Sequence, residues 1–180
     1  MKISKTSLTV LAFARDLPNS RTRSEERTRW FADDRRIYVY RREGFKALTE
    51  FLPPPERRGL VFVDPSYELG DEWQRVLAAL SRAHRRWQTG VLAAWYPIQQ
   101  RQTVDGFLNQ LRTSGMRRIL VTELCPLPTD VGRRLNGSGI VIVNPPWQID
   151  EQLREVLPWL HSVLDSQGRG GWRVEWLVPE

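Results

Sequence analysis

The chain has 180 residues, of which 41% are hydrophobic and 27% are charged, and its formal net charge is +6 at pH 7. A chain of this length suits one domain with a sizeable core, and this composition excludes an intrinsically disordered protein. No apolar run approaches the length of a membrane span, and a single cysteine, Cys125, excludes an internal disulfide and fits a reducing cytoplasm.

The basic residues are almost all arginine, because only Lys2, Lys5 and Lys46 among the 27 basic residues are lysine. A basic balance favours a polyanionic partner such as nucleic acid, and arginine can both pair with phosphate and stack on bases. An arginine-biased genome explains the same composition, so both interpretations stay open here.

Residues 1–34 show the least coherent pattern of the chain. The apolar stretch at residues 8–14 is too short, and too closely followed by charges, for a secretory signal, so we expect a cytoplasmic protein. The charged run at residues 21–29 has too few apolar positions to bury a helix face and predicts an exposed helix or a disordered arm. We therefore place the folded domain at residues 35–180.

Within that domain, short apolar runs alternate with amphipathic segments. Apolar runs bounded by glycine, proline and polar residues predict strands, and apolar residues spaced three and four apart predict helices. Strands are expected at residues 37–40, 59–63, 90–96, 116–124, 139–143 and 172–178, and helices at residues 45–52, 71–88, 101–113 and 150–164, the last interrupted by Pro158.

The order of these elements is β-α-β-α-β-α-β-β-α-β, which predicts an α/β fold with a mostly parallel sheet. The loop between the runs at residues 116–124 and 139–143 is too short for a crossover helix. These two strands are therefore expected to form an antiparallel pair at one end of the sheet.

The apolar run at residues 59–63 stops at Asp64-Pro65-Ser66-Tyr67. Such a run predicts a strand buried on both faces, and open α/β sheets bind ligands at the carboxyl ends of these strands. The Asp64 carboxylate and the Pro65 carbonyl could accept both N–H hydrogens of an exocyclic amine on a nucleobase, which would free the nitrogen lone pair. The fixed φ of proline would aim these acceptors, and Tyr67 would stack on a base taken out of its helix.

Other interpretations stay open from the residues alone. Asp64 could instead cap the following helix, as in an ordinary strand-to-helix turn. A second stretch, Asn144-Pro145-Pro146-Trp147, also follows an apolar run with a polar residue, a proline and an aromatic ring. Because its strand belongs to the expected antiparallel pair, we interpret this stretch as structural or substrate-contacting. His84 has no second histidine or cysteine at metal spacing, so no metal site is expected.

Over most of its length, from Arg42 to Glu180, the chain resembles the carboxyl-terminal part of the bacterial 23S ribosomal RNA adenine-N6 methyltransferases. The matching pieces keep the same order along the chain. The resemblance is therefore far more specific than the short motif Asp64-Pro65-Ser66-Tyr67 alone. They are Glu43-Gly44-Phe45, Arg57-Arg58-Gly59-Leu60, Val63-Asp64-Pro65-Ser66-Tyr67-Glu68, Trp95-Tyr96-Pro97, residues 139–147, Leu157-Pro158-Trp159-Leu160-His161 and Trp176-Leu177-Val178-Pro179-Glu180.

The resemblance implies a Rossmann-like methyltransferase that uses S-adenosylmethionine and acts on 23S ribosomal RNA, without a metal or a membrane, and we expect a monomer. It implies that Asp64, Pro65 and Tyr67 are catalytic. Glu43 and Gly44 match residues that sit beside the adenine of the cofactor, and Asp64 also contacts the cofactor. The Asn144 loop is a regular feature of the family outside its catalytic loop, and His161 is structural.

Two departures from the family pattern stand out. Ser66 replaces a second proline, which loosens the loop by one fixed torsion but leaves both acceptors and the ring. The family's glycine-rich turn, its histidine-rich start and the carboxylate for the cofactor ribose do not occur in residues 1–41.

The missing part would leave the strand before Asp64 with an unpaired edge, and residues 8–14 are the only local segment that could pair there. We therefore expect a truncated or frame-shifted family member with poor or absent affinity for the cofactor. Three functions remain: adenine-N6 methylation of 23S ribosomal RNA, RNA binding by an inactive remnant, and DNA adenine-N6 methylation.

Overall fold

The computed structural model of the chain describes residues 9–14, 40, 43–55, 58–68, 70–129, 134–165 and 167–180. These residues form a sheet with helices on both of its faces. The strands are β1 (Thr9–Ala14), β2 (Gly59–Asp64), β3 (Val91–Ile98), β4 (Ile119–Cys125), β5 (Gly137–Val143) and β6 (Gly171–Val178), and the helices are α2 (Gly44–Phe51), α3 (Glu72–Arg86), α4 (Arg101–Arg112) and α5 (Ile149–Leu164).

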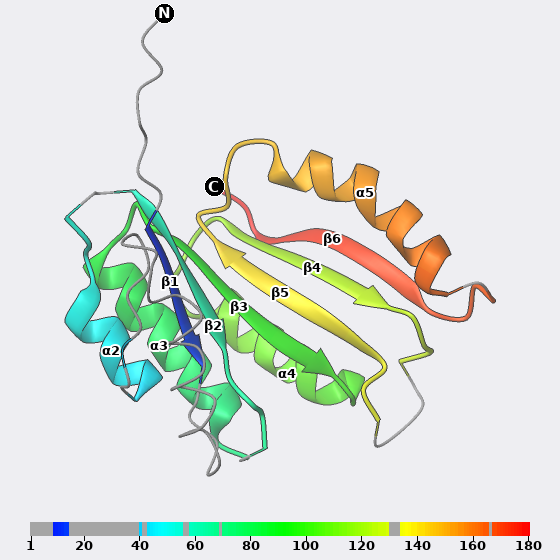
Figure 1. Cartoon of the computed structure of the whole chain (residues 1–180), viewed down its shortest axis with the longest axis horizontal. Coiled ribbons are helices and arrows are strands. Elements are labelled where there is room, and N and C mark those ends of the chain that lie inside the picture. Colours follow the sequence, from blue (N-terminus) through cyan, green and yellow to red (C-terminus); the bar gives the residue numbers. More distant parts are fainter. Residues whose placement is uncertain are drawn as a thin grey trace, which may run out of the picture.

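The six strands lie in the order β1-β2-β3-β5-β4-β6 (Figure 1). The pairs β1/β2 and β2/β3 are parallel, whereas β3/β5, β4/β5 and β4/β6 are antiparallel. Because β4 and β3 are both antiparallel to the strand between them, they run in the same direction. The carboxyl ends of β1, β2, β3 and β4 therefore lie at one edge of the sheet.

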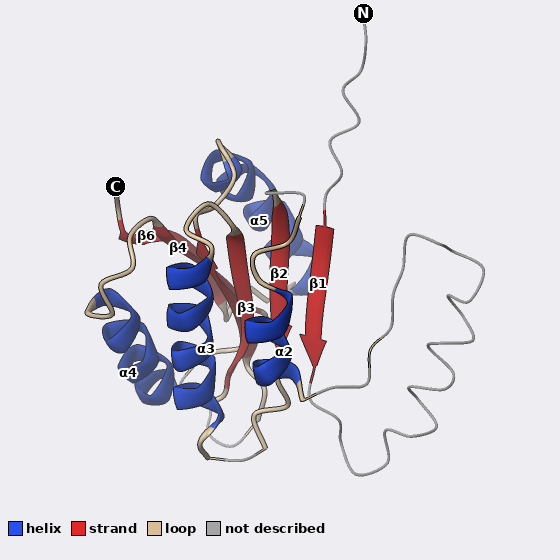
Figure 2. Ribbon diagram, turned by 90° about the vertical axis from the view of Figure 1, so that its left-hand side faces the viewer, coloured by secondary structure: helices blue, strands red, loops and turns tan. Residues whose placement is uncertain are grey.

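The helices form two layers. Figure 2 shows α2, α3 and α4 side by side over one face of the sheet, while α5 lies on the other face and packs against β4 and β6. This arrangement buries most of both faces of β3 and β4, whereas β2 and β5 alternate buried and half-buried residues. The nearly continuous apolar runs of β3 and β4 follow from burial on both faces.

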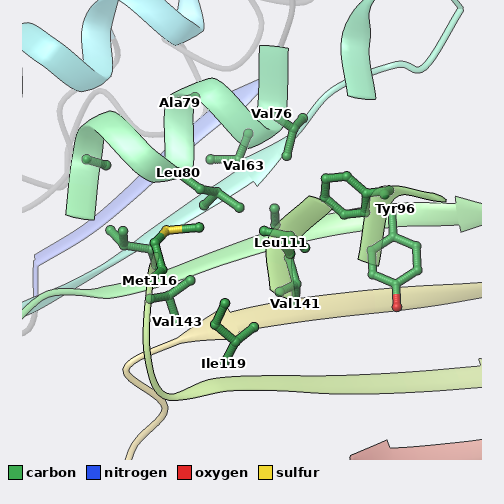
Figure 3. Packing of buried hydrophobic residues seen from close by; sticks show 14 of the residues in the cluster. Val63, Val76, Ala79, Leu80, Tyr96, Leu111, Met116, Ile119, Val141 and Val143 are labelled. Carbon is green, nitrogen blue, oxygen red and sulfur yellow. The ribbon is translucent and has the colours of Figure 1, made fainter. Parts of the chain in front are cut away.

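The main core lies between the sheet and the layer of α3 and α4 (Figure 3). α3 contributes one stripe of residues spaced three and four apart, and β2 contributes every second residue, as the periods of a helix and a strand require. The buried members from these two elements are Val61, Val63, Val76, Ala79, Leu80 and Ala83.

The element order expected for residues 45–180 is confirmed, including the antiparallel pair β4/β5. The antiparallel part is larger than the expected antiparallel end, because β5 also pairs with β3 and β6 with β4, so that three of the five strand pairs are antiparallel. α5 continues through Pro158, although proline was expected to interrupt it. None of the helices in the described ranges combines the length and the apolar character that a bilayer crossing would need.

The amino-terminal region is described only in part. The strand expected at residues 37–40 lies outside the described residues except for Tyr40, which belongs to no helix or strand, and the charged run at residues 21–29 also lies outside them. β1 is described, and it pairs in parallel with β2 from Thr9↔Gly59 to Ala14↔Asp64. The apolar stretch that was the only local candidate for pairing with β2 does pair with it, and this strand lies outside the residues 35–180 at which the folded domain was placed.

Candidate active site

Asp64 is the last residue of β2, and its side chain is exposed at the carboxyl edge of the parallel strands. Partial burial raises the pKa of this carboxyl group, because desolvation penalises its charged form. Asp64 does not cap the next helix, since α3 begins after Asp71. The carboxylate is thus left facing solvent at the edge of the sheet where α/β folds bind their ligands.

The two residues after Asp64 hold the loop in place. Pro65 is buried, and the Ser66 hydroxyl donates a hydrogen bond of 3.2 Å to Glu72 Oε1 in the first turn of α3. Glu72 is completely buried. The serine that replaces the family's second proline therefore ties the loop to α3 through a hydrogen bond, whereas a proline would hold it through a fixed torsion.

Tyr67 is anchored at both ends of its side chain. Its hydroxyl donates a hydrogen bond of 2.8 Å to the Trp95 carbonyl on β3, and its ring lies 4.6 Å from the ring of Trp73, between centroids. Burial, together with the nearby charges of Glu72 and Asp64, raises its pKa, so the hydroxyl stays a donor. The ring is half-buried, and its backbone adopts a left-handed φ of 54°.

Glu43 lies directly before α2 and caps it. One carboxylate oxygen accepts a hydrogen bond of 2.8 Å from the Lys46 backbone N–H, and the other pairs with the Arg75 guanidinium at 2.5 Å. Arg75 in turn lies over the ring of Phe45, 4.5 Å from its centroid. Gly44 is the first residue of α2, so its backbone stands at the start of that helix.

The start of α3 brings the two predicted groups into one region. Glu72, in its first turn, binds the loop that follows Asp64, and Arg75, one turn later, binds Glu43. The residues predicted to bind cofactor and those predicted to be catalytic therefore contact the same two turns of one helix.

The second motif, Asn144-Pro145-Pro146-Trp147, lies on the side of the sheet where β2 and β3 begin, opposite to Asp64. Because β5 is antiparallel to β3, Asn144 follows the end of β5 beside the start of β3, away from Asp64. Its side-chain amide donates hydrogen bonds to the carbonyls of Gln88 and Gly90, and its φ is 53°, a left-handed conformation that asparagine tolerates. These contacts agree with the structural interpretation of the Asn144 loop.

A buried polar network runs across four neighbouring strands, on the same side of the sheet as Asp64. Tyr96, Gly139, Glu123 and Arg173 are neighbours in register across β3, β5, β4 and β6. The Tyr96 hydroxyl donates to Glu123 at 2.7 Å, passing over Gly139, where an added Cβ would lie only 2.1 Å from the ring. Glu123 also accepts hydrogen bonds from Arg173 at 2.9 Å and from Arg101 at 2.8 and 3.1 Å.

The sequence provides no local signal for this network or for the role of Glu72. Glu123 lies within an apolar run and Glu72 at the start of an amphipathic helix, and neither position indicates burial with a partner. The network was missed because the partners of Glu123 come from distant segments. The role of Glu72 was missed because its contact with Ser66 depends on the path of the loop between them. His161, by contrast, lies in the last turn of α5, 3.5 Å from Asp165, which agrees with its structural interpretation.

No group of three His, Cys, Asp or Glu side chains that could hold a metal ion occurs in the described part of the chain. Cys125 is buried in the core. Burial, together with the charge of Glu123, raises the pKa of its thiol, so the thiol is neutral at physiological pH.

An α/β sheet with helices on both faces and an Asp-Pro-x-Tyr loop at the carboxyl end of a parallel strand is consistent with the class of Rossmann-like methyltransferases. The comparison with known families supports this class. The chain belongs to the family described as "Ribosomal RNA large subunit methyltransferase D, RlmJ", whose model matches residues 24–178.

Two curated relatives are each called ribosomal RNA large subunit methyltransferase J. The protein from Escherichia coli K12 is 41% identical over 150 residues, which cover 83% of this chain and 54% of that protein. The protein from Haemophilus influenzae is also 41% identical, over 83% of this chain and 53% of that protein. The chain thus spans about half the length of these relatives.

A solved structure has a similar fold. The crystal structure of protein LPL1258 from Legionella pneumophila superimposes with a TM-score of 0.79 at 26% sequence identity. The match covers 92% of this chain and 60% of the other.

The residues that could hold a cofactor fit one end of S-adenosylmethionine. Glu43 is 40% exposed, and a carboxylate with two accepted hydrogen bonds has lone pairs left for an exocyclic amine. For the methionine end, no glycine-rich turn is available before Gly44, because residues 1–43 contain no glycine. The described residues therefore fit the adenine end of the cofactor and leave its methionine end without a cradle.

Proposed function

We propose that this chain carries the catalytic loop of an enzyme that methylates the exocyclic N6 of an adenine in 23S ribosomal RNA. The observation that carries the proposal is the exposed Asp64 carboxylate at the carboxyl end of β2, in a chain that belongs to a ribosomal RNA methyltransferase family. S-adenosylmethionine would supply the electrophilic methyl group.

The loop has the acceptors that this chemistry needs. Asp64 and the Pro65 carbonyl would accept the two N–H hydrogens of the adenine amine and so localise its lone pair. Both acceptors stand on a rigid element, because Asp64 ends a paired strand and Pro65 is buried. A strong base is not needed, since the nitrogen loses its proton readily once it is alkylated.

Tyr67 would position the base. Its hydroxyl is held by the Trp95 carbonyl, so the orientation of the ring is set before substrate arrives. The part of the ring not covered by Trp73 would stack on an adenine taken out of its helix.

The first test is methyl transfer from labelled S-adenosylmethionine to unmodified 23S ribosomal RNA, with single-stranded and duplex DNA measured in parallel. The cofactor is supplied at high concentration, because the described residues offer no cradle for its methionine end. Replacing Asp64 by alanine should reduce transfer at least about a hundredfold, as loss of one preorganised transition-state contact does. The amount of RNA that the Asp64→Ala variant retains on a filter should stay nearly the same as for the unmodified chain.

Asp71→Ala is the matched control, because Asp71 is an exposed carboxylate nearby that makes no side-chain capping hydrogen bond. Full activity of Asp64→Ala would show that the assigned site is wrong. Transfer to DNA but not to RNA would replace the proposed substrate, and RNA retention without any transfer by the unmodified chain would identify an inactive remnant.

A further inference from the structure

A cavity of about 330 Å³ opens beside the end of β4 and the start of β6. It lies next to the buried network of Glu123, and its walls come from two segments that are distant in sequence: the end of β4 with the loop after it, and the turn before β6 with the start of β6. The residues that matter for its chemistry are Glu123, Cys125, Arg169, Trp172 and Arg173.

The cavity lies at the same edge of the sheet as Asp64. β4 runs in the same direction as β2, so Cys125 at its end and Asp64 at the end of β2 face the same side. Three strand spacings separate β2 from β4 in the sheet, which corresponds to about 14 Å. An extended polynucleotide with one base at Asp64 can therefore reach the cavity with a nearby nucleotide.

Arg173 offers a rigid planar cation. One of its guanidinium nitrogens donates to Glu123 at 2.9 Å and another to Glu175 at 3.3 Å, so its plane is fixed from two sides. Its side chain keeps 35% of its surface exposed. Because adjacent residues of a strand point to opposite faces, this guanidinium and the ring of Trp172 lie on opposite faces of β6, and Arg173 contributes a fixed polar wall of the cavity.

Trp172 and Arg169 supply two kinds of contact that single-stranded RNA uses. Trp172 is 41% exposed and lines the cavity, so part of its aromatic surface is available to a base. Arg169 is exposed, and within the described ranges no carboxylate pairs with it, so its charge is available to a phosphate.

Other occupants fit less well. The described cavity lining has no set of metal ligands, and the Cys125 thiol is neutral and buried, so neither a metal nor covalent chemistry is indicated. The volume is at the lower end of the range for small-molecule sites and suits a ligand of nucleoside size.

We propose that this cavity binds an unpaired nucleotide of the RNA substrate, beside the adenine that lies at Asp64, with its base against Trp172 at the rim of the cavity and its phosphate near Arg169. This inference rests on the proposed function for the identity of the polymer. It assigns RNA recognition to the carboxyl end of β4, on the same side of the sheet as the carboxyl end of β2, where methyl transfer is proposed.

The test is the binding of a fluorescent single-stranded RNA oligonucleotide to the full chain without S-adenosylmethionine, followed by anisotropy over a series of salt concentrations. Trp172→Ala should weaken binding roughly tenfold, as loss of one stacked base does. Arg169→Ala should lower the slope of log affinity against log salt by about 0.7, the value for one phosphate contact with a single strand.

Matched controls come from the opposite edge of the sheet. Trp147 is 84% exposed beyond the end of β5, and Arg85 is exposed near the end of α3. Trp147→Ala and Arg85→Ala should leave both affinity and salt slope nearly unchanged. Thermal unfolding of all four variants shows that the fold is retained.

Equal losses in the cavity variants and the controls would overturn the inference, as would a duplex RNA that competes as well as the single strand. Failure of the unmodified chain to bind RNA would overturn it too. The proposed function fails separately, by the absence of methyl transfer or its persistence in Asp64→Ala. A chain that binds RNA through the cavity without transferring methyl groups would therefore retain this inference and lose the proposed function.

Discussion

At the scale of single residues, the loop after β2 combines exposure with anchoring. Asp64 faces solvent, while Ser66 and Tyr67 are each hydrogen-bonded to a neighbouring element. The exposed carboxylate can meet a substrate, and the anchored residues after it keep the loop from moving away. A substitution of Asp64 should therefore affect chemistry more than folding.

The raised pKa of Asp64 predicts the sign of its effect on stability. Because its pKa is higher in the folded chain than in the unfolded chain, this residue favours folding at low pH, and that contribution is lost as the pH rises through the folded pKa. Asp64→Asn should therefore be more stable than the unmodified chain at pH 7, and the difference should shrink on acidification.

Urea unfolding at several pH values between 4 and 7 measures this difference. Asp71→Asn serves as the comparison, because it removes a nearby exposed carboxylate from outside the loop. A difference for Asp64→Asn that is constant across the pH range would contradict the assigned environment of Asp64.

At the scale of elements, Glu123 joins β3, β4, β6 and α4 through its contacts with Tyr96, Arg173 and Arg101. Burial alone would raise the pKa of Glu123, but the hydrogen bonds from Arg101 and Tyr96 and the charge of Arg173 lower it overall. The ionised carboxylate is therefore the form that stabilises this part of the sheet.

Glu123→Ala should reduce the free energy of unfolding by about 3 kcal/mol at pH 7, because it leaves the partners of a buried ion pair uncompensated. Asp105 makes an exposed salt bridge with the same arginine, and Asp105→Ala should cost less than about 0.5 kcal/mol. Chemical denaturation measures both values, and similar losses for the two variants would show that the network contributes little.

The pH dependence of this network has the opposite sign to that of Asp64. Since the folded pKa of Glu123 lies below its ordinary value, its contribution is present above that ordinary value and is lost as the pH falls through the folded pKa. The stability gap between the unmodified chain and Glu123→Gln should therefore narrow under acidic conditions.

At the scale of the whole molecule, the described residues form a sheet whose edge carries the candidate catalytic loop, while the chain spans about half the length of its curated relatives. β1 pairs with β2 as far as Asp64. Without β1, the backbone of β2 would form the exposed edge of the sheet. This strand comes from a segment without any glycine, so it is not followed by a glycine-rich cofactor turn.

We therefore expect this chain by itself to bind S-adenosylmethionine weakly or not at all. Isothermal titration measures the affinity, and the full-length Escherichia coli relative titrated side by side provides the reference for the assay. Tight binding by this chain would contradict the expectation and show that residues outside the described ranges hold the methionine end.

The sequence alone determined much of the fold from residue 45 onward, because each strand and helix there follows from a local period of apolar residues. It also predicted the β4/β5 pair from the length of a loop, and it left residues 8–14 as the only local candidate for pairing with β2. It singled out Asp64 as the candidate catalytic carboxylate because that residue follows an apolar strand.

Only the tertiary structure decided which polar residues meet. The anchoring of Tyr67 on β3 and the row from Tyr96 to Arg173 join segments that are far apart in the chain. The contact of Ser66 with the buried Glu72 depends on the path of the short loop between them. It also separated the two similar motifs, since the reversal of β5 carries Asn144 to the opposite edge from Asp64. The physical reason is that apolar periods specify elements locally, whereas hydrogen bonds between side chains depend on strand order, direction and register.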